Sequence, residues 1–453
     1  MRRRVSLLLA ILLPFAIAFV PAGAYEAPGG ARFNVPKPWG NDEASYRLVR
    51  TVMTAIQNTR PTKKIPHPEI HIATYLMDHT PSVDAMIAAC RRGVQIRVIL
   101  DEDIDNYNSR RLITALNADN TRDKDGDGTG DTDPRAGACN GPIKGTQHSR
   151  TTTEGDGGPI PLMTPRQARR SVKAPSGASD TWGKDGSYVK KCNGACRGKG
   201  GNMHSKFYLF ERTGKSKHVV MVSSSNINHG GARLGWNDMY VMKGRPKSYR
   251  GYKAVHRLMS EDVQANNDKV EIKDGPFVSR FFPMRNASRS SDPTMQDLNR
   301  VRCTSNIGRT AIHVSMFYLK GSRGNYIVDK LLSLARAGCS VNIIYGAPSI
   351  QLAERLRAAA RAGTINLYDS RWDHNDDGFN EVRTHAKYVL VRGTVGADRS
   401  AWHVWTGTQN WVAGSLRKGD ENSLNIALRS AYSDYLRNWN VIRAHSRRLP
   451  YTG

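Results

Sequence analysis

The chain repeats itself, and an internal repeat restricts the fold more than any other feature of a sequence. Residues 69–78 (EIHIATYLMD) match residues 311–320 (AIHVSMFYLK), and both runs are typical of buried strands. In each copy an amphipathic helix that ends in glycine leads into a second apolar strand, over residues 84–100 and 329–345. Strand, helix and strand in this order indicate a right-handed parallel crossover. We therefore predict an α/β fold of two similar α/β/α layered domains related by a pseudo-two-fold axis.

The repeat resumes at residues 203–210 (MHSKFYLF) and 384–391 (THAKYVLV), where each predicted strand opens on a His-x-Lys motif. Because successive strand side chains point to opposite faces, the histidine and the lysine of one motif share a face. A further apolar strand then ends in a Ser/Thr-x-Asn turn, and an acidic residue follows. The residues are His204, Lys206, Ser224, Asn226 and Asp238 in the first copy, and His385, Lys387, Thr408, Asn410 and Glu421 in the second.

The position of the two motifs is more informative than the motifs themselves. Composition alone would give roughly one His-x-Lys in a chain of this length. Here two occur, at equivalent points of a repeat that is found without them. This coincidence predicts one active site at the interface of the two halves.

Residues 1–24 have the layout of a secretory signal peptide, with three arginines, an apolar run and a small-residue end at Ala22-Gly23-Ala24. An uncleaved anchor is the alternative, although the apolar stretch is short for a spanning helix. The Arg3-Arg4 pair is also compatible with twin-arginine export. We expect a secreted, extracellular protein.

The formal net charge of +27 includes three arginines of this leader. Such a charge attracts polyanions, and it does not choose among nucleic acid, anionic lipid head groups and cell-wall polymers. A soluble exported protein with no polyanionic partner is the alternative reading of the charge. Six cysteines in an exported chain predict disulfide bonds rather than a metal site, with at least one bridge among Cys139, Cys192 and Cys196.

The spacing of the repeat predicts the domain organisation. Gly93 and His204 are 111 residues apart, whereas Gly338 and His385 are 47 apart. The first half, 25–245, should therefore carry an insertion at about 118–200, whose polar composition indicates a long surface loop or lid. The second half is expected at 246–453.

The doubled pattern of His-x-Lys, an apolar run and Gly/Ser-Ser/Thr-x-Asn resembles the phospholipase D superfamily, over most of the chain apart from 118–200. The resemblance suggests a secreted bacterial phospholipase D-like protein. That family usually has Asp five residues after the motif lysine, and this chain has Glu211 and Arg392 there. Arg392 therefore leaves a catalytically degenerate relative as an alternative.

The resemblance implies a phosphodiesterase mechanism with a phosphohistidine intermediate. His204 is expected to attack phosphorus and His385 to act as general acid, although the pseudo-symmetry leaves the reverse assignment open. Lys206 and Lys387 would neutralise the phosphate oxygens. Hydrogen bonds to the phosphate are expected from Asn226, Asn410, Ser224 and Thr408. Asp238 and Glu421 are expected to hold the outer nitrogen of each histidine, with ordinary surface acids as the alternative.

Two further features are not absorbed by this mechanism. The run Asp123, Asp125, Asp127 and Asp131 resembles half of a calcium loop, and a similar run from Asp373 to Glu381 precedes the second motif. Neither has Glu at the twelfth position, so a solvated turn is the alternative. Bound calcium would be structural, and catalysis should require no metal or other cofactor. Four tryptophans lie near the second motif, and they suit either a lipid interface, base stacking or, for at least two of them, the core: Trp372, Trp402, Trp405 and Trp411.

Three functions are compatible with the sequence. The first is a phospholipase D that hydrolyses glycerophospholipids or transfers their head groups, with a phospholipid or membrane surface as its partner. The second is a nuclease of the same superfamily, favoured by the positive charge. The third is a noncatalytic binder of anionic polymers or membrane surfaces. We expect a monomer in each case.

Overall fold

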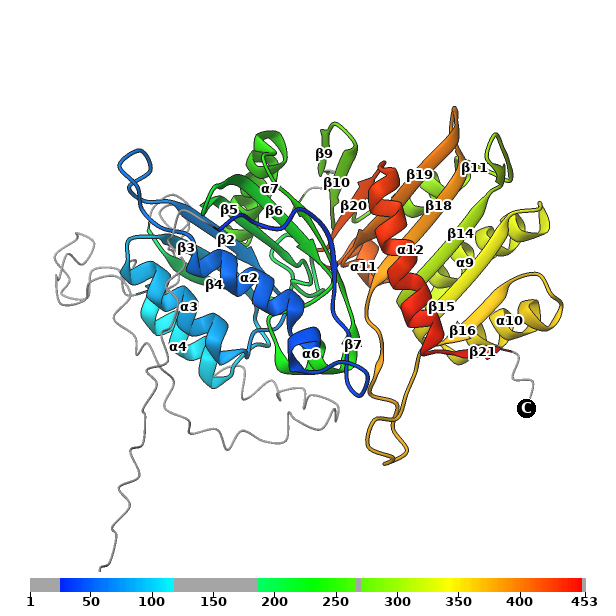
Figure 1. Cartoon of the computed structure of the whole chain (residues 1–453), viewed down its shortest axis with the longest axis horizontal. Coiled ribbons are helices and arrows are strands. Elements are labelled where there is room, and N and C mark those ends of the chain that lie inside the picture. The colour runs from blue at the N-terminus through cyan, green and yellow to red at the C-terminus, as the bar shows by residue number, and fades with distance from the viewer. Residues whose placement is uncertain (1–24, 118–185, 266–269, 450–453) are drawn as a thin grey trace, which may run out of the picture.

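The two copies of the repeat form two separate β-sheets. The computed structural model describes residues 25–117, 186–265 and 270–449. In Figure 1 the first half is coloured blue to green and the second light green to red, and the two lie side by side. The predicted α/β fold with two similar halves is therefore confirmed.

The first half is built around a mixed sheet with the strand order β1-β8-β6-β5-β2-β3-β4 within the described residues. Strands β2, β3 and β4 are parallel, and β5 runs antiparallel to β2. The elements are β1 (Gly30–Phe33), α1 (Asp42–Ser45), α2 (Arg47–Gln57), β2 (Glu69–Ala73), α3 (Thr80–Arg91), β3 (Gln95–Asp101), α4 (Tyr107–Asn117), β4 (Tyr188–Cys192), β5 (Phe207–Thr213), β6 (Ser216–Ser223), α6 (His229–Leu234), β7 (Gly235–Trp236), β8 (Asp238–Met242) and α7 (Pro246–Ser260).

The second half repeats this plan with the order β21-β16-β15-β14-β18-β19-β20-β10-β9. The elements are β9 (Val270–Asp274), β10 (Phe277–Phe281), α8 (Pro293–Asn299), β11 (Val301–Arg302), β12 (Thr304–Ser305), β13 (Gly308–Arg309), β14 (Ala311–Leu319), α9 (Gly321–Arg336), β15 (Ser340–Pro348), α10 (Ile350–Arg361), β16 (Asn366–Asp369), β17 (Arg383–Thr384), β18 (Lys387–Val395), β19 (Asp398–Gly407), α11 (Ala413–Arg417), β20 (Asn422–Ile426), α12 (Arg429–Ala444) and β21 (Arg447–Leu449).

The glycines that close the repeated helices have a conformational role. Helix α3 ends at Arg91, and Gly93 follows with φ of 91°. Helix α9 ends at Arg336, and Gly338 follows with φ of 99°. A left-handed residue at this point terminates a helix and turns the chain, and glycine adopts it without a steric penalty. Each turn delivers the chain into the parallel strand of the predicted crossover, β3 or β15.

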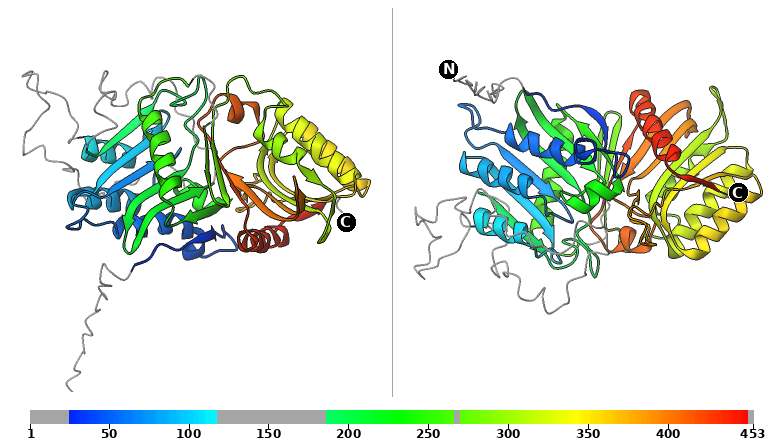
Figure 2. Two further views of the ribbon diagram at one scale, coloured as in Figure 1. Left: turned by 90° about the horizontal axis from the view of Figure 1, so that it is seen from above. Right: turned by 60° about the horizontal axis from the view of Figure 1, so that its bottom comes forward.

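The three largest apolar clusters among the described residues hold the layers together. One fills the space between the first sheet and helices α2 and α3, and a second lies between the other sheet and helices α8, α9 and α10. The third contains buried aromatic residues from both halves, including Phe207, Tyr252, Tyr388 and Tyr435. This shared cluster includes side chains of α7 in the first half and of α12 in the second, so the two halves pack through one continuous core. Figure 2 shows the two halves side by side from two further directions.

The predicted insertion at 118–200 and the predicted boundary at 245–246 can be compared with the structure. Part of the predicted 118–200 insertion, Tyr188–Cys192, is strand β4 of the first sheet, because it pairs in parallel with β3 as β16 does with β15. The rest of the insertion up to residue 185, with the expected lid, lies outside the described residues. The expected boundary at 245–246 falls just before α7, which packs on β6 of the first sheet.

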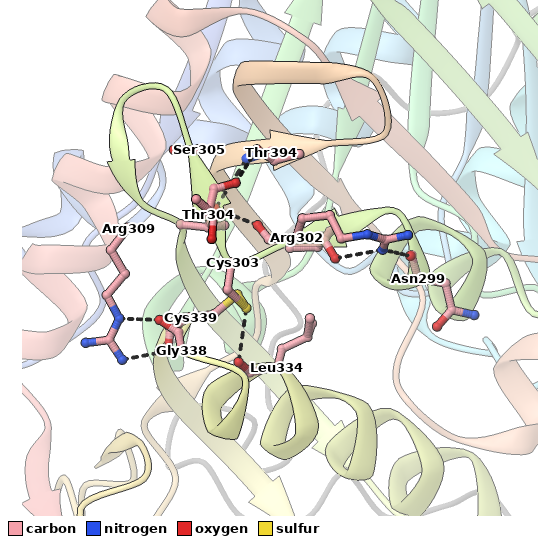
Figure 3. The surroundings of a disulfide bond; sticks show 12 residues. Asn299, Arg302, Cys303, Thr304, Ser305, Arg309, Leu334, Gly338, Cys339 and Thr394 are labelled. Carbon is pink, nitrogen blue, oxygen red and sulfur yellow. Dashed lines mark hydrogen bonds between the residues drawn. A yellow bond between two sulfur atoms is a disulfide. The ribbon is translucent and has the colours of Figure 1, made fainter.

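Two disulfide bonds join described residues. Cys192–Cys196 closes a short loop after β4, as the sequence predicted for this region. Cys303–Cys339 ties the start of β12 to the turn between α9 and β15, where Arg309 also donates to the backbone of Cys339 (Figure 3). Among the described residues we find no helix with the length and apolar character that a membrane span requires.

Candidate active site

The two His-x-Lys motifs meet at the interface, because each is bonded to the opposite half. The backbone N–H of His204 donates to Asp420 O at 2.9 Å, and that of His385 donates to Trp236 O at 2.9 Å. Strand β17, directly before His385, pairs in parallel with β7 of the first half. Burial lowers the pKa of the His385 imidazole, and the charges of Lys206 and His204 add to this effect, so both groups of the first motif lie near His385. The structure therefore gathers both motifs in one site.

The two imidazoles have different partners. His204 Nδ1 lies 2.9 Å from Glu421 Oε2, whereas His385 Nδ1 lies 2.8 Å from the amide oxygen Asn237 Oδ1. Both partners accept a hydrogen bond from Nδ1–H and so leave Nε2 of each neutral ring with a lone pair for chemistry. Each histidine is therefore oriented by the other half, one by a carboxylate and the other by an uncharged amide.

The expectation that Asp238 orients a histidine is wrong. Asp238 Oδ2 accepts from Thr406 Oγ1 at 2.5 Å and from the Tyr435 hydroxyl at 2.9 Å, inside the shared core. The reason is a one-residue offset in the repeat. Ser224 N donates to Asp238 O, whereas Thr408 N donates to Asn422 O, so Asp238 corresponds to Asn422 rather than to Glu421. The true counterpart of Glu421 is Asn237.

The hydroxyls of Ser224 and Thr408 do not face a phosphate position, which corrects a second expectation. Both residues have no exposed surface. Ser224 Oγ donates to Asn237 Oδ1 at 3.2 Å, and the Thr408 hydroxyl helps to lower the pKa of Glu421 through a hydrogen bond. The two hydroxyls therefore bond Asn237 and Glu421, the residues that accept a hydrogen bond from the motif histidines.

The two turn asparagines have different contacts. Asn226 Oδ1 accepts from Leu76 N at 3.2 Å. Asn410 Oδ1 is buried and has no hydrogen-bond partner among the described residues. A buried amide oxygen without a partner is rare in proteins. The Asn410 carbonyl accepts from Arg323, whose guanidinium is fixed by a buried ion pair with Asp292 at 2.8 Å.

Burial determines the charge of the two lysines. Lys206 is fully buried and Lys387 is 3% exposed. Burial, opposed by Glu421, lowers the pKa of Lys206 well below its ordinary value, and it lowers the pKa of Lys387 to about 7. Each ammonium donates to the carbonyl oxygen of the histidine in its own motif. An anionic phosphate placed between them would favour the charged form of both lysines.

The electrostatics of the two histidines also differ. Burial and the positive charges of Lys387 and Lys206 lower the pKa of His385 well below its ordinary value. Burial lowers the pKa of His204, but the carboxylate of Glu421 opposes the shift. The pKa of Glu421 is raised by burial and lowered by His204 and Lys206, and it lies below its ordinary value overall. A positive charge is thus better stabilised on His204 than on His385.

An aromatic ring lies beside each motif, and sequence reasoning missed both. The Tyr75 ring is 5.4 Å from the His204 ring and 5.4 Å from Lys206 Nζ. The Phe317 ring is 4.9 Å from the His385 ring and 5.1 Å from Lys387 Nζ. The repeat itself carried the signal, because Tyr75 and Phe317 occupy equivalent positions in EIHIATY and AIHVSMF.

Two buried carboxylates fix the segment that carries His204. Asp101 Oδ2 accepts from Met203 N at 2.7 Å. Asp420 accepts from Arg197 N at 3.2 Å with both oxygens, which attaches the Cys192–Cys196 loop to the segment bearing Glu421. Burial raises the pKa of each acid to about 7.

The two residues that replace the usual Asp have structural contacts. Glu211 Oε2 accepts from Glu69 N at 3.2 Å at the far end of β2. The Arg392 guanidinium lies 5.1 Å from the Trp402 ring, and its Nη2 donates to Ile307 O at 3.1 Å. Neither residue makes a hydrogen bond to the motif histidines within the described part of the chain.

The remaining predictions concern the two calcium-like runs and the four tryptophans. Asp123, Asp125, Asp127 and Asp131 lie outside the described residues. In the second calcium-like run, ligand atoms of Asp373, Asp377 and Glu381 lie within 4.8 Å of one another. Of the four tryptophans, Trp405 and Trp411 are core residues, Trp402 is half-buried, and Trp372 is 44% exposed.

Several solved structures resemble the fold of this chain. Phosphatidylserine synthase from Haemophilus influenzae shares the fold, with a TM-score of 0.50 and 13% identity over 93% of this chain and 88% of that one. Polyphosphate kinase from Porphyromonas gingivalis has a TM-score of 0.48 and 12% identity over 91% of this chain, which spans only 50% of that kinase. Yeast tyrosyl-DNA phosphodiesterase has a TM-score of 0.44 and 8% identity over 89% of this chain and 90% of that one. No curated protein sequence matches the chain.

A family match covers both halves and both motifs. Residues 64–259 and 305–440 match the family described as cardiolipin synthase, PLD-like domain. The first range contains His204 and Asn237, and the second contains His385 and Glu421. The chain therefore belongs to the PLD-like domain family of the phospholipase D superfamily, whose members act on phosphodiesters.

Proposed function

We propose that the protein is a secreted phospholipase D that hydrolyses glycerophospholipids, or transfers their phosphatidyl group to an alcohol, through a phosphohistidine. The observation that carries the proposal is the pair of histidines in one buried site, each held at Nδ1 by a partner from the opposite half. The family description, cardiolipin synthase, supports a phospholipid substrate. Export remains part of the proposal, and the two disulfide bonds are compatible with it.

In the first step His204 Nε2 attacks phosphorus and the bond from phosphorus to the head-group oxygen breaks. His385 Nε2 gives a proton to that oxygen, and the head-group alcohol departs. The assignment of His204 as nucleophile is supported by Glu421, because a phosphorylated imidazole is a cation and the neighbouring carboxylate stabilises it. The weaker stabilisation of positive charge on His385 suits a proton donor.

In the second step water attacks phosphorus and transfers a proton to His385. The bond from phosphorus to His204 Nε2 breaks, and phosphatidic acid leaves with the site restored. An alcohol in place of water gives the transfer product. Lys206 and Lys387 would neutralise the nonbridging oxygens in both steps, with Asn226 and Asn410 donating hydrogen bonds. The lysines and asparagines thus supply the charge neutralisation, and His385 supplies the proton transfers, that both steps require.

The experiment offers phosphatidylcholine vesicles and plasmid DNA in parallel, with and without EDTA. We expect choline release that persists in EDTA and that falls below detection in His204→Ala and His385→Ala. His67→Ala, at an exposed histidine outside the site, serves as the matched control and should retain full activity. Unchanged choline release in either motif variant would exclude this mechanism.

The same experiment discriminates the two alternatives. Nicking of the plasmid without choline release would indicate a nuclease, which the net charge of +27 favours. Neither choline release nor plasmid nicking, with retained binding to anionic vesicles, would indicate the noncatalytic binder. That outcome would agree with the arginine at position 392.

A further inference from the structure

Arg383 is a half-buried cation without an acidic partner, two residues before His385. Its guanidinium donates one hydrogen bond, from Nη1 to Asn380 O at 3.1 Å. Among the described residues no carboxylate oxygen lies within 4 Å of it, unlike Arg371, which is paired with Asp369 at 2.7 Å. Removing an unpaired charge from water is unfavourable, and proteins retain such groups mainly where a ligand supplies the counter-charge.

The position of Arg383 connects it to the reaction. The guanidinium lies 5.4 Å from the centre of the Phe317 ring, which also contacts His385 at 4.9 Å and Lys387 Nζ at 5.1 Å. The charge of Arg383 reaches His385 and contributes to the low pKa of that imidazole. Glu381 attracts the guanidinium at longer range, but it accepts a hydrogen bond from His374 N.

The His204 side of the site has the opposite charge. Asn202 occupies the position equivalent to Arg383, two residues before the motif histidine. Beside Tyr75, the counterpart of Phe317, the carboxylates of Asp101 and Asp103 contribute to the raised pKa of the phenol. The pseudo-two-fold site is therefore basic on the side of His385 and acidic on the side of His204.

We propose that Arg383 and Phe317 form a leaving-group subsite that binds a second anionic group, a phosphate or a carboxylate, on the departing head group. This inference rests on the proposed function and refines its substrate class. The proton donor must lie next to the leaving oxygen, so the head group must depart past His385 and its neighbours Phe317 and Arg383. A head group with its own anion would supply the counter-charge that Arg383 lacks.

The exposed residues near this subsite favour a phospholipid over nucleic acid. The segment that leads into β17 carries Phe379, which is 71% exposed, and Trp372, which is 44% exposed. Large apolar side chains on a projecting loop suit the boundary between lipid head groups and acyl chains. We therefore assign the subsite to phospholipids with an anionic head group.

The test compares head groups in mixed micelles of an uncharged detergent. The substrates are phosphatidylethanol, phosphatidylcholine and phosphatidylglycerol 3-phosphate, and the measured product is phosphatidic acid in each case. Because a hydrogen bond to a charged group strengthens binding, we expect kcat/KM for the phosphate-bearing lipid to exceed that for phosphatidylethanol by about tenfold or more. Arg383→Gln should abolish this ratio, and Arg383→Lys should retain part of it.

Controls separate this inference from the proposed function. Arg361→Gln, at an exposed arginine at the end of α10, should keep the wild-type ratio. Turnover of none of the lipids by the wild type would contradict the proposed function itself. Turnover of all three lipids with the same ratio in wild type and Arg383→Gln would overturn the subsite alone. Arg383-dependent nicking of plasmid DNA without lipid turnover would overturn the assignment to phospholipids.

Discussion

Replacing Glu421 with glutamine tests the asymmetry between the two histidines directly. Glutamine keeps an oxygen that can accept from His204 Nδ1, so the variant removes the charge and preserves the shape. In the wild type the carboxylate is 2% exposed and lies 2.9 Å from the ring nitrogen. At ~4 to 5 Å between charge centres and an effective dielectric constant of ~20, the attraction between carboxylate and imidazolium is about 3 to 4 kcal/mol. Formation of the phosphoenzyme should therefore slow by roughly 100- to 1000-fold.

The assay is a single-turnover experiment with phospholipid labelled in its phosphate. Acid quenching would trap the phosphohistidine, and its rate of appearance isolates the first chemical step from product release. Asp238→Asn is the matched control, because it also removes a buried carboxylate of the site region but one bonded to Thr406 and Tyr435. We expect that control to change the rate by only a few-fold. A normal rate in Glu421→Gln, or an equal loss in Asp238→Asn, would refute the pairing of Glu421 with the nucleophile.

Three further predictions concern stability and pH. Replacing both Cys303 and Cys339 with serine removes a bridge across 36 residues and should lower the free energy of unfolding by about 4 kcal/mol, as measured by denaturant titration. Steady-state kinetics should show an unchanged kcat. Burial raises the pKa of Asp420 to about 7, so the stability contributed by its protonated form is complete below the unfolded pKa and is lost as the pH rises to 7. The Asp420→Asn variant should therefore show a smaller decline of Tm between pH 4 and 7. Asn237→Asp places a carboxylate beside His385 Nδ1 and should raise the pKa of His385, so that the alkaline limb of the pH–rate profile shifts to higher pH. An alkaline limb at the wild-type pH would contradict the role of His385 as the acid.

The sequence predicted the features that depend on periodicity and on repetition. The strand, helix and strand order of each half follows from apolar spacing and from the glycines at 93 and 338, and the structure has these elements in the predicted places. His204 and His385 were located because both copies of the repeat contain them. The strand Tyr188–Cys192 was missed because it lies beyond a long polar stretch and is only five residues long.

The errors at the site arise from register and from contacts between halves. Sequence comparison aligned Asp238 with Glu421 because both are acidic, whereas the backbone hydrogen bonds align Asn237 with Glu421. The equivalence of an asparagine and a glutamate cannot be recognised from residue type, although both side chains accept a hydrogen bond from an imidazole. The burial of Ser224 and Thr408 could not be predicted either, because it depends on how each turn packs against a later strand of its own half, where Ser224 N donates to Asp238 O and Thr408 N to Asn422 O.

The exchange of partners explains how a nearly symmetric fold can support an asymmetric reaction. Each half supplies a histidine and a lysine, and each also supplies the acceptor that orients the histidine of the other half. Neither half therefore contains a complete site, and a change in one acceptor alters the chemistry of the opposite motif. Because one acceptor is Glu421 and the other Asn237, the same two-fold frame gives one imidazole that tolerates a lasting positive charge and one that releases its proton readily. Under the proposed mechanism, a single residue at each equivalent position therefore separates the nucleophile from the acid.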